Sequence, residues 1–219
     1  GELSSSVVHE MRNPLSSIKM NLQALRRKTQ GDPDYEELAE IAAAQAQRVE
    51  TMLDDLLQYG RPVELNPQPT SFRELTEPAL AVVADKAREK NVRVELKDEL
   101  GNARLSVDRE QMCRAMTNLL ANAIQAVAPG QTVYVIGTRR NDAGPAHAQL
   151  EVRDTGPGLS PEALDRAFKP FFTSKPNGTG LGLANVKKII ELHRGAVSAS
   201  NRPEGGAAIT LLIPLEGNV

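Results

Sequence analysis

Two stretches within the first 60 residues place apolar side chains at steps of three and four, the pattern of amphipathic helices that pack on other helices. One spans residues 8–25 and the other residues 38–59. The segment 31–34, Gly-Asp-Pro-Asp, supplies turn chemistry between them. The pattern predicts an antiparallel helical hairpin. Because two helices alone form no closed core, we expect two copies to make a homodimeric four-helix bundle through residues 3–59.

The first of these helices carries a histidine on its flank. His9 lies one position after Val8 of the apolar seam, so its side chain points sideways, where a second domain can reach it. Pro14 removes a backbone hydrogen bond and crowds the carbonyl of Glu10, so the helix should bend beside His9. Glu10 can accept the Nδ1 proton of His9, which leaves Nε2 as a neutral nucleophile. Asn13 follows four residues after His9 on the same face. Alone, a His-Glu pair is more typical of an ordinary solvated helix face than of a reactive site.

Length and composition limit the possible partners. A chain of 219 residues suits two domains, and 40% hydrophobic with 25% charged residues is typical of globular proteins. The net charge of −2 and the 3% aromatic content give no basic surface or stacking platform, so we expect no nucleic-acid partner.

The single cysteine, Cys113, cannot form an internal disulfide, which favours a reducing, cytoplasmic location. We find no run that approaches the roughly 18 apolar residues of a membrane span. The chain begins eight residues before His9. We therefore expect membrane contact only through a segment absent from this chain, which would then be the cytoplasmic portion of a membrane-bound sensor.

Three prolines between residues 62 and 69 predict an extended hinge over residues 61–70, after a helical domain over 1–60. From Ser71 the pattern changes to mixed α/β. We predict helices at 72–90, from 108 onward and at 181–194, with strands at 92–96, 132–138, 148–153, 196–200 and 207–213. Asp108, with Gln111 three residues later, predicts a capping-box start for the second of these helices, and Gly195 is the predicted C-cap of the third. The predicted fold class is thus α+β: a hairpin, and then a 71–219 domain built as an α/β sandwich, a mixed sheet with helices on one face.

Two amides lie four residues apart on the helix that begins at residue 108. Asn118 and Asn122 therefore project from one face of this helix. A neutral amide oxygen suits Mg²⁺ beside phosphate oxygens, because it adds no further negative charge. Two polar residues on a solvated helix face are the simpler alternative.

Two glycine-rich segments follow. The first, Asp154 to Gly158, comes directly after a predicted strand; a carboxylate there can accept from an exocyclic amine, and Gly156 and Gly158 allow close backbone approach to a planar ring. A tight turn is the alternative reading. The second segment, Gly178-Thr179-Gly180-Leu181-Gly182-Leu183, opens a helix whose N–H groups can hold a phosphate. Its spacing excludes a P-loop and disfavours a dinucleotide fold.

Taken together, these motifs resemble the catalytic core of sensor histidine kinases. His9 to Leu15 resembles the phosphoacceptor box, His-Glu-x-x-Asn-Pro-Leu. Asn118 to Ala123 resembles the N box, Asp154 to Gly158 the first Gly box, Phe168 to Phe172 the F box and Gly178 to Leu183 the second Gly box. The last four motifs are shared with type II topoisomerases and heat-shock ATPase chaperones.

The resemblance implies ATP and Mg²⁺ as cofactors, with Asn122 on the metal, Asp154 on the adenine amine, and the loop between the Gly boxes closing over ATP. Lys175 in that loop would reach the γ-phosphate, or would be a solvated lysine. Kinases of this type often carry Thr before an aromatic residue where this chain has Ala207-Ala208-Ile209. His147 and His193 are assigned to a surface position and to a helix end near the helix dipole.

The implied activity is an ATP-dependent protein-histidine kinase that phosphorylates His9 and passes the phosphoryl group to an Asp of a response regulator. Asn13 would position a water for a second, phosphatase activity on the regulator. Two alternatives remain open at this level. One is an ATP-driven conformational clamp of the same ATPase fold, without phosphohistidine. The other is a non-catalytic dimeric scaffold.

Overall fold

The structure, a computed structural model, describes residues 33–60, 62–140, 146–175 and 178–215, together with residues 15, 16, 18 and 20–22. It divides into a first compact unit drawn from residues 1–63 and 175–181, and a second from residues 64–174 and 182–219. Among the described residues, no helix combines the length and the apolar content needed to cross a membrane.

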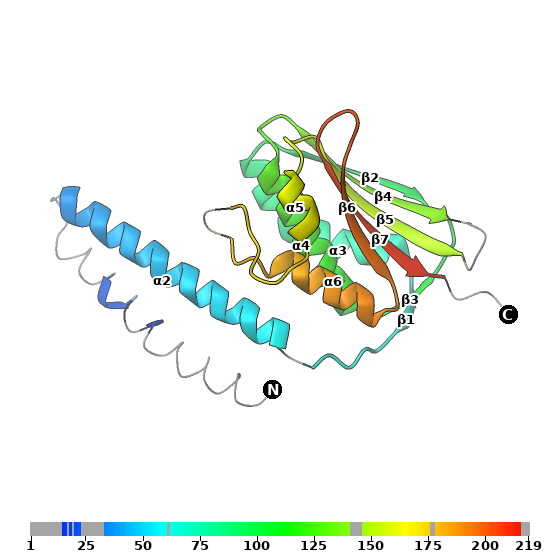
Figure 1. The fold of residues 1–219 in the computed structure, drawn as a ribbon, viewed down its shortest axis with the longest axis horizontal. Helices are drawn as coiled ribbons and strands as arrows, with labels where there is room; N and C mark the ends of the chain where they lie inside the picture. The colour runs from blue at the N-terminus through cyan, green and yellow to red at the C-terminus, as the bar shows by residue number, and fades with distance from the viewer. Residues whose placement is uncertain are drawn as a thin grey trace. The chain divides into compact units, whose positions relative to one another are not determined.

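The main described element of the first unit is helix α2, Pro33–Gly60, which confirms the predicted second helix (Figure 1). Three side chains at heptad spacing are buried along it: Ala39, Ala46 and Leu53. The predicted apolar seam lies on a different stripe and is mostly exposed. Its exposed apolar members are Leu38, Ile41, Val49 and Leu56. An apolar stripe of this length on one helix is a surface suited to another helix.

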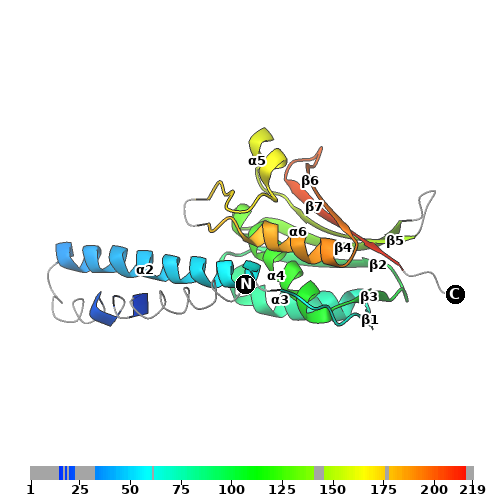
Figure 2. The ribbon, with the colours of Figure 1, turned by 60° about the horizontal axis from the view of Figure 1, so that its bottom comes forward.

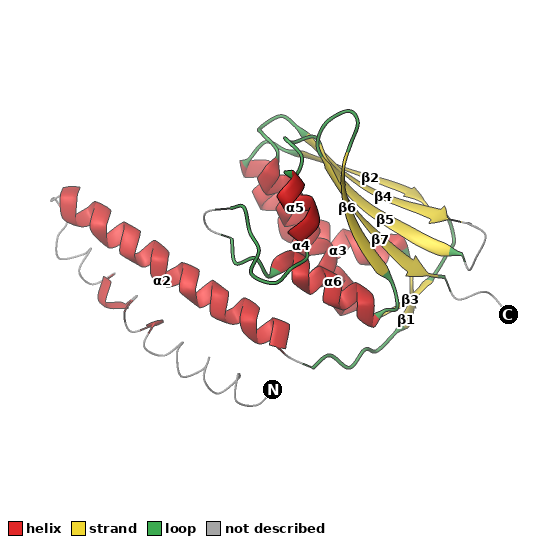
Figure 3. Cartoon of the chain, viewed as in Figure 1, coloured by secondary structure: helices red, strands yellow, loops and turns green. Residues whose placement is uncertain are grey.

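The second unit is built on a five-stranded mixed sheet, which confirms the predicted architecture (Figure 3). Its strand order is β2-β4-β5-β7-β6, with β2 parallel to β4 and the other neighbours antiparallel. The strands are β2 (Arg93–Glu99), β4 (Thr132–Arg140), β5 (His147–Asp154), β6 (Ala196–Asn201) and β7 (Ala207–Pro214).

A smaller sheet pairs β1 (Gln68–Thr70) antiparallel with β3 (Leu105–Val107). Neither strand was predicted from the sequence, and β1 falls inside the predicted 61–70 hinge. In the described part of the chain β1 pairs with β3 alone, and such an edge position is where a strand tolerates a proline such as Pro69.

Helices α3 (Phe72–Glu89), α4 (Arg109–Ala126) and α6 (Gly182–Leu192) lie on one face of the five-stranded sheet (Figure 2). A short helix, α5 (Pro161–Arg166), follows β5 and was not predicted. The core between the helices and the sheet is apolar and nearly closed to solvent. Its largest fully buried members are Phe72, Leu75, Leu105, Met112, Met116, Leu119, Leu120, Leu150, Ile190, Leu211 and Ile213. Gly137 on β4 is required there, because a Cβ would lie 2.9 Å from the Phe72 ring.

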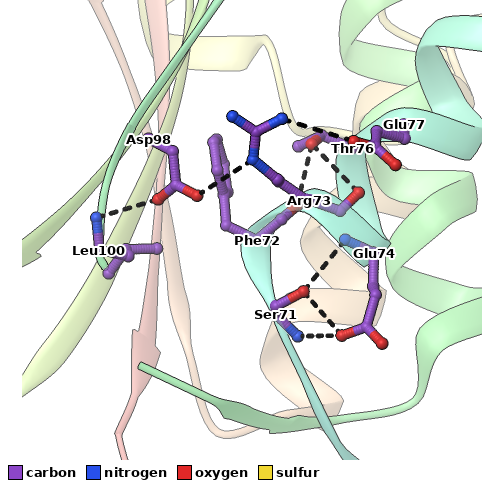
Figure 4. A network of polar contacts seen from close by, with 8 residues as sticks. All are labelled: Ser71, Phe72, Arg73, Glu74, Thr76, Glu77, Asp98 and Leu100. Carbon is purple, nitrogen blue, oxygen red and sulfur yellow. Dashed lines mark hydrogen bonds and ion pairs between the residues drawn. The ribbon is translucent and has the colours of Figure 1, made fainter. Parts of the chain in front are cut away.

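Helix α3 begins with a complete capping box (Figure 4). The Ser71 hydroxyl accepts from the Glu74 N–H at 3.3 Å, and the Glu74 carboxylate accepts from the Ser71 N–H at 2.8 Å. The same carboxylate accepts from the Ser71 hydroxyl and from Arg104 Nη1, both at 2.7 Å. The two hydrogen bonds from Ser71, and then the Arg104 charge, hold the pKa of Glu74 below its usual value.

Glu74→Gln is expected to lower the free energy of unfolding at neutral pH and to have a smaller effect in acid. A carboxyl whose pKa is lowered by folding stabilises the protein above its unfolded pKa of about 4.3, and this contribution is lost as the pH falls through the folded value. Glutamine is tolerated at this position of a capping box, so the substitution mainly removes the charge. Denaturant unfolding from pH 7 to pH 3 measures the difference. Glu77→Gln is the control, since Glu77 pairs with Arg73 at 3.6 Å on the solvent-exposed surface. Equal pH dependence of both variants would contradict the prediction.

The end of α6 corrects one sequence expectation. Gly195 was predicted as a left-handed C-cap, but the residue with positive φ is Arg194, at 57°. Gly195 is needed for a different reason: a Cβ there would overlap the Leu212 carbonyl oxygen of β7 and the Ile190 side chain. The glycine therefore allows α6 to turn tightly into β6 against the sheet.

Candidate functional site

Helix α4 carries the two predicted amides and is fixed at both ends. At its start the Asp108 carboxylate accepts from the Gln111 N–H at 3.0 Å, as the sequence predicted. At its end the Lys90 ammonium donates to the carbonyls of Ile124 and Gln125, at 3.0 and 2.7 Å. A cation there also suits the negative end of the helix dipole.

Asn118 and Asn122 both lie beside the first residue of α6. The Asn118 amide approaches the Gly182 carbonyl at 3.5 Å. A Cβ on Gly182 would lie 3.8 Å from Asn122 Nδ2. The structure thus brings three of the predicted site residues together, because α4 and α6 pack side by side on the sheet.

The opposite ends of α4 and α6 are joined by His193. This residue is 9% exposed, and its Nε2 accepts from the Asp108 N–H at 2.9 Å. Its Nδ1 lies 2.8 Å from the Ile189 carbonyl and takes the donor role, since Nε2 is an acceptor. His193 therefore bridges the two helices and is not merely a helix-end residue near the dipole. No local pattern could have shown this, because its partner is 85 positions away.

Asp154 ends β5 and is 7% exposed. Its Oδ1 accepts from the N–H groups of Gly156 and Ala207, at 2.8 and 3.2 Å. Within the described residues, no hydrogen bond to its Oδ2 is found. One carboxylate oxygen is thus held by backbone donors, while the other can accept from a ligand.

The loop after Asp154 lies against the end of α4. A Cβ on Gly156 would be 3.1 Å from the Ala126 carbonyl oxygen. The Thr155 hydroxyl pairs with both backbone groups of Thr132, each at 3.2 Å, and Gln131 donates to the Thr155 carbonyl at 2.8 Å. Gly158 has φ of +79°, which favours glycine there. The second unit therefore unites Asn118, Asn122, Asp154, Gly156, Gly158 and Gly182 in one continuous framework.

The other candidate residues are placed differently. Lys175, Gly178, Thr179, Gly180 and Leu181 belong to the first unit. Within that segment the Gly178 N–H donates to the Lys175 carbonyl at 3.2 Å, and the Thr179 hydroxyl lies 3.4 Å from the Leu181 N–H. His9, Glu10 and Asn13 lie outside the described residues.

Comparison with known families accounts for this framework. Residues 107–217 match the model of the histidine kinase-, DNA gyrase B- and HSP90-like ATPases, which covers all the motifs of the second unit. The chain belongs to this family. Residues 1–64 match the His Kinase A (phospho-acceptor) domain. The predicted resemblance to the histidine kinase core is confirmed.

Curated relatives agree with this assignment. The chain is 32% identical over 217 residues to the sensor histidine kinase ZraS of Klebsiella oxytoca, which covers 99% of this chain and 46% of ZraS. It is 32% identical over 222 residues to the signal transduction histidine-protein kinase AtoS of Escherichia coli, covering 100% of this chain and 36% of AtoS. The chain thus spans less than half the length of these two relatives.

Solved structures show the same fold. Full-length ShkA in complex with AMPPNP superposes with a TM-score of 0.76 at 22% identity, covering 100% of this chain and 46% of ShkA. Histidine kinase ThkA in complex with the response regulator protein TrrA gives a TM-score of 0.72 at 25% identity, covering 99% of this chain and 62% of that chain.

Proposed function

We propose that the chain is the core of an ATP-dependent protein-histidine kinase that phosphorylates His9. The observation that carries this proposal is the buried Asp154, with Oδ1 held by two backbone N–H groups, in the same framework as Asn118 and Asn122. The match of residues 1–64 to a phospho-acceptor domain supports a phosphoryl acceptor in the same chain. It also argues against a clamp without phosphohistidine and against a non-catalytic scaffold.

The chemistry of the donor set fits ATP with Mg²⁺. Asn122 would hold the metal through its amide oxygen, and Mg²⁺ accepts such oxygens together with phosphate oxygens and water. In the part of the chain that the structure describes, no group of three or more His, Cys, Asp or Glu side chains is placed to hold a metal ion. A metal held by amides and by the substrate needs no such cluster. When bound, the ion would neutralise charge on the phosphates.

Asp154 would accept from the exocyclic amine of adenine through Oδ2. Gly156 and Gly158 would lie against the ring, and Gly178 to Gly182 would present N–H groups to the phosphates. Lys175 would add a positive charge near the γ-phosphate. These contacts position the nucleotide, which is the main requirement in phosphoryl transfer.

In the proposed transfer, Glu10 holds the Nδ1 proton of His9 and Nε2 attacks the γ-phosphorus. The N–P bond forms as the bond to the β,γ-bridging oxygen breaks, and ADP leaves with that electron pair. The phosphoryl group then passes to an Asp carboxylate of a response regulator. The relative ThkA was solved in complex with such a regulator protein, which supports this class of partner. Asn13 would place a water for a second, phosphatase activity, in which water removes the phosphoryl group from the regulator.

We further propose a homodimer through residues 3–59, because α2 exposes a stripe of apolar side chains that a second copy would cover. Its members include Leu38, Ile41 and Val49. The proposed organisation is a phosphotransfer hairpin (1–60), a hinge (61–70) that lets the catalytic domain (71–219) move, and a cytoplasmic location. Any membrane anchor would belong to a segment outside this chain.

Mass spectrometry under alkaline conditions tests the proposed function. After incubation with ATP and Mg²⁺, the peptide containing His9 should gain the mass of one phosphoryl group, and the added mass should disappear after mild acid treatment. Free phosphate release with no modified histidine would instead identify an ATPase clamp, and absence of nucleotide binding would identify a scaffold.

A further inference from the structure

The loop Thr155–Leu159, directly after Asp154, has no regular secondary structure to fix its shape. It joins β5 to α5 and contains two glycines, so its backbone has many accessible conformations when free. The contacts of Thr155 hold only its beginning against β4. The loop follows Asp154 directly, so the contacts that hold the rest of the loop also influence the direction in which Asp154 presents Oδ2.

The β6–β7 turn, which we take as residues 201–206 and which begins with the last residue of β6, meets this loop from the other side; both lie at the same end of the sheet (Figure 1). Asn201 Oδ1 accepts from the Leu159 N–H at 2.7 Å, and Asn201 Nδ2 donates to the Leu159 carbonyl at 2.8 Å. One side-chain amide thus pairs with both backbone groups of a single residue, as a neighbouring strand would. A Cβ on Gly158 would lie 2.9 Å from Asn201 Oδ1, so the amide also requires glycine at that position.

Arg202 holds the start of the loop, at Asp154. Its Nη1 donates to the Asp154 carbonyl at 2.9 Å, and its own N–H donates to the Gly206 carbonyl at 2.9 Å. The Arg202 side chain is 18% exposed, and Nη2 pairs with Glu204 at 3.6 Å. Directly after the turn, the Ala207 N–H reaches Asp154 Oδ1. The turn and Ala207 therefore hydrogen-bond to the carbonyl and the carboxylate of Asp154, and Asn201 hydrogen-bonds to Leu159 at the end of the loop.

We propose that Asn201 and Arg202 are positioning residues that set the base selectivity of the nucleotide site. They act through Asp154: with Oδ1 saturated by backbone donors, the direction of Oδ2 depends on where the turn holds residue 154. An amine at position 6 of a purine donates to this oxygen, whereas a carbonyl at that position presents a second acceptor and is repelled. The turn would thus favour adenine over hypoxanthine. This inference rests on the proposed function, in which Asp154 contacts the base.

The test compares the affinities of the full chain for ATP and inosine triphosphate, measured by competition against a fluorescent ATP analogue. In Asn201→Ala and Arg202→Met, ATP affinity is expected to fall about 10-fold, as loss of one well-placed hydrogen bond would predict. Inosine triphosphate affinity should change less than about 2-fold, because its carbonyl at position 6 has no hydrogen to donate to Oδ2. The ATP preference therefore falls. A purely structural role would weaken both nucleotides equally and leave the preference unchanged.

More conservative variants test the proposal if Asn201→Ala or Arg202→Met unfolds the protein. Arg202→Lys retains a donor toward the Asp154 carbonyl and should keep the wild-type preference. Asn201→Asp retains size and the acceptor but loses the donor, and should lose part of the preference. Ser198→Ala, an exposed position on β6, is the matched control. An ATP preference equal to that of the wild type in all of the folded Asn201 and Arg202 variants would overturn the proposal.

Asp154→Asn separates this inference from the proposed function. If the wild type shows no ATP preference, or if Asp154→Asn keeps it, the assignment of Asp154 to the base fails. If Asp154→Asn abolishes the preference while the variants of the turn retain it, only the role of Asn201 and Arg202 fails.

Discussion

His9→Gln is expected to abolish the incorporation of phosphate from ATP into the protein. Glutamine is polar and compatible with a helix, so the hairpin should fold, but its amide nitrogen has no lone pair available for attack. Nucleotide binding should stay at the wild-type level, because the residues proposed to bind ATP lie elsewhere in the chain. The measurement is label transferred from γ-labelled ATP, read beside a nucleotide titration.

His147→Gln is the matched control for this loss. It also removes one imidazole, but from the first residue of β5, and should incorporate label like the wild type. The label on the wild type should survive alkali and be lost in acid, as a phosphorus–nitrogen bond requires. Label that persists on His9→Gln would remove His9 from the mechanism, and acid-stable label would point to a hydroxyl acceptor.

Gly206→Ala is expected to lower the free energy of unfolding by about 3 kcal/mol. Gly206 has φ of +89°, where a side chain is strained by about 1 kcal/mol. The added Cβ would also overlap the Asp154 carbonyl oxygen, so the turn must move away from the loop, at about 2 kcal/mol. ATP binding should weaken as well, since the Ala207 N–H that follows Gly206 holds Asp154 Oδ1.

Gly205→Ala provides the control, because it introduces the backbone strain of a positive φ without a steric overlap between the new Cβ and the loop. Gly205 has φ of +94°, but a Cβ there would meet nothing within 4 Å. This variant should therefore lose only about 1 kcal/mol and bind ATP normally. Chemical denaturation and nucleotide titration of both variants measure the difference. Equal stability of the two would show that the turn can shift at no cost, which would contradict the tight contact between the turn and the loop.

Sequence periodicity was sufficient for most of the larger elements. The three-four pattern predicted α2, and the changes between helical and alternating patterns predicted α3, α4, α6 and the five strands of the main sheet. Short elements were missed: β1 and β3 are three residues each and α5 is six, too short for a period to emerge. The prediction of Gly195 as the C-cap of α6 was also wrong: Arg194 is the residue with positive φ, and Gly195 is needed because β7 approaches it closely, which is not a local property.

For the site, local sequence identified the groups that carry chemistry, because each motif is a run of neighbouring residues: Asn118 with Asn122, Asp154 with its glycines, and the histidine box. Their arrangement depended on pairs far apart in the chain. His193 reaches Asp108 across 85 positions, and Asn201 reaches Leu159 across 42. Such contacts arise only when the folded domain brings separate segments of the chain together, and a local sequence pattern does not reveal them because the hydrogen-bond partners are backbone groups. Sequence alone thus determined which side chains could act, and tertiary structure decided which backbone groups hold them in place.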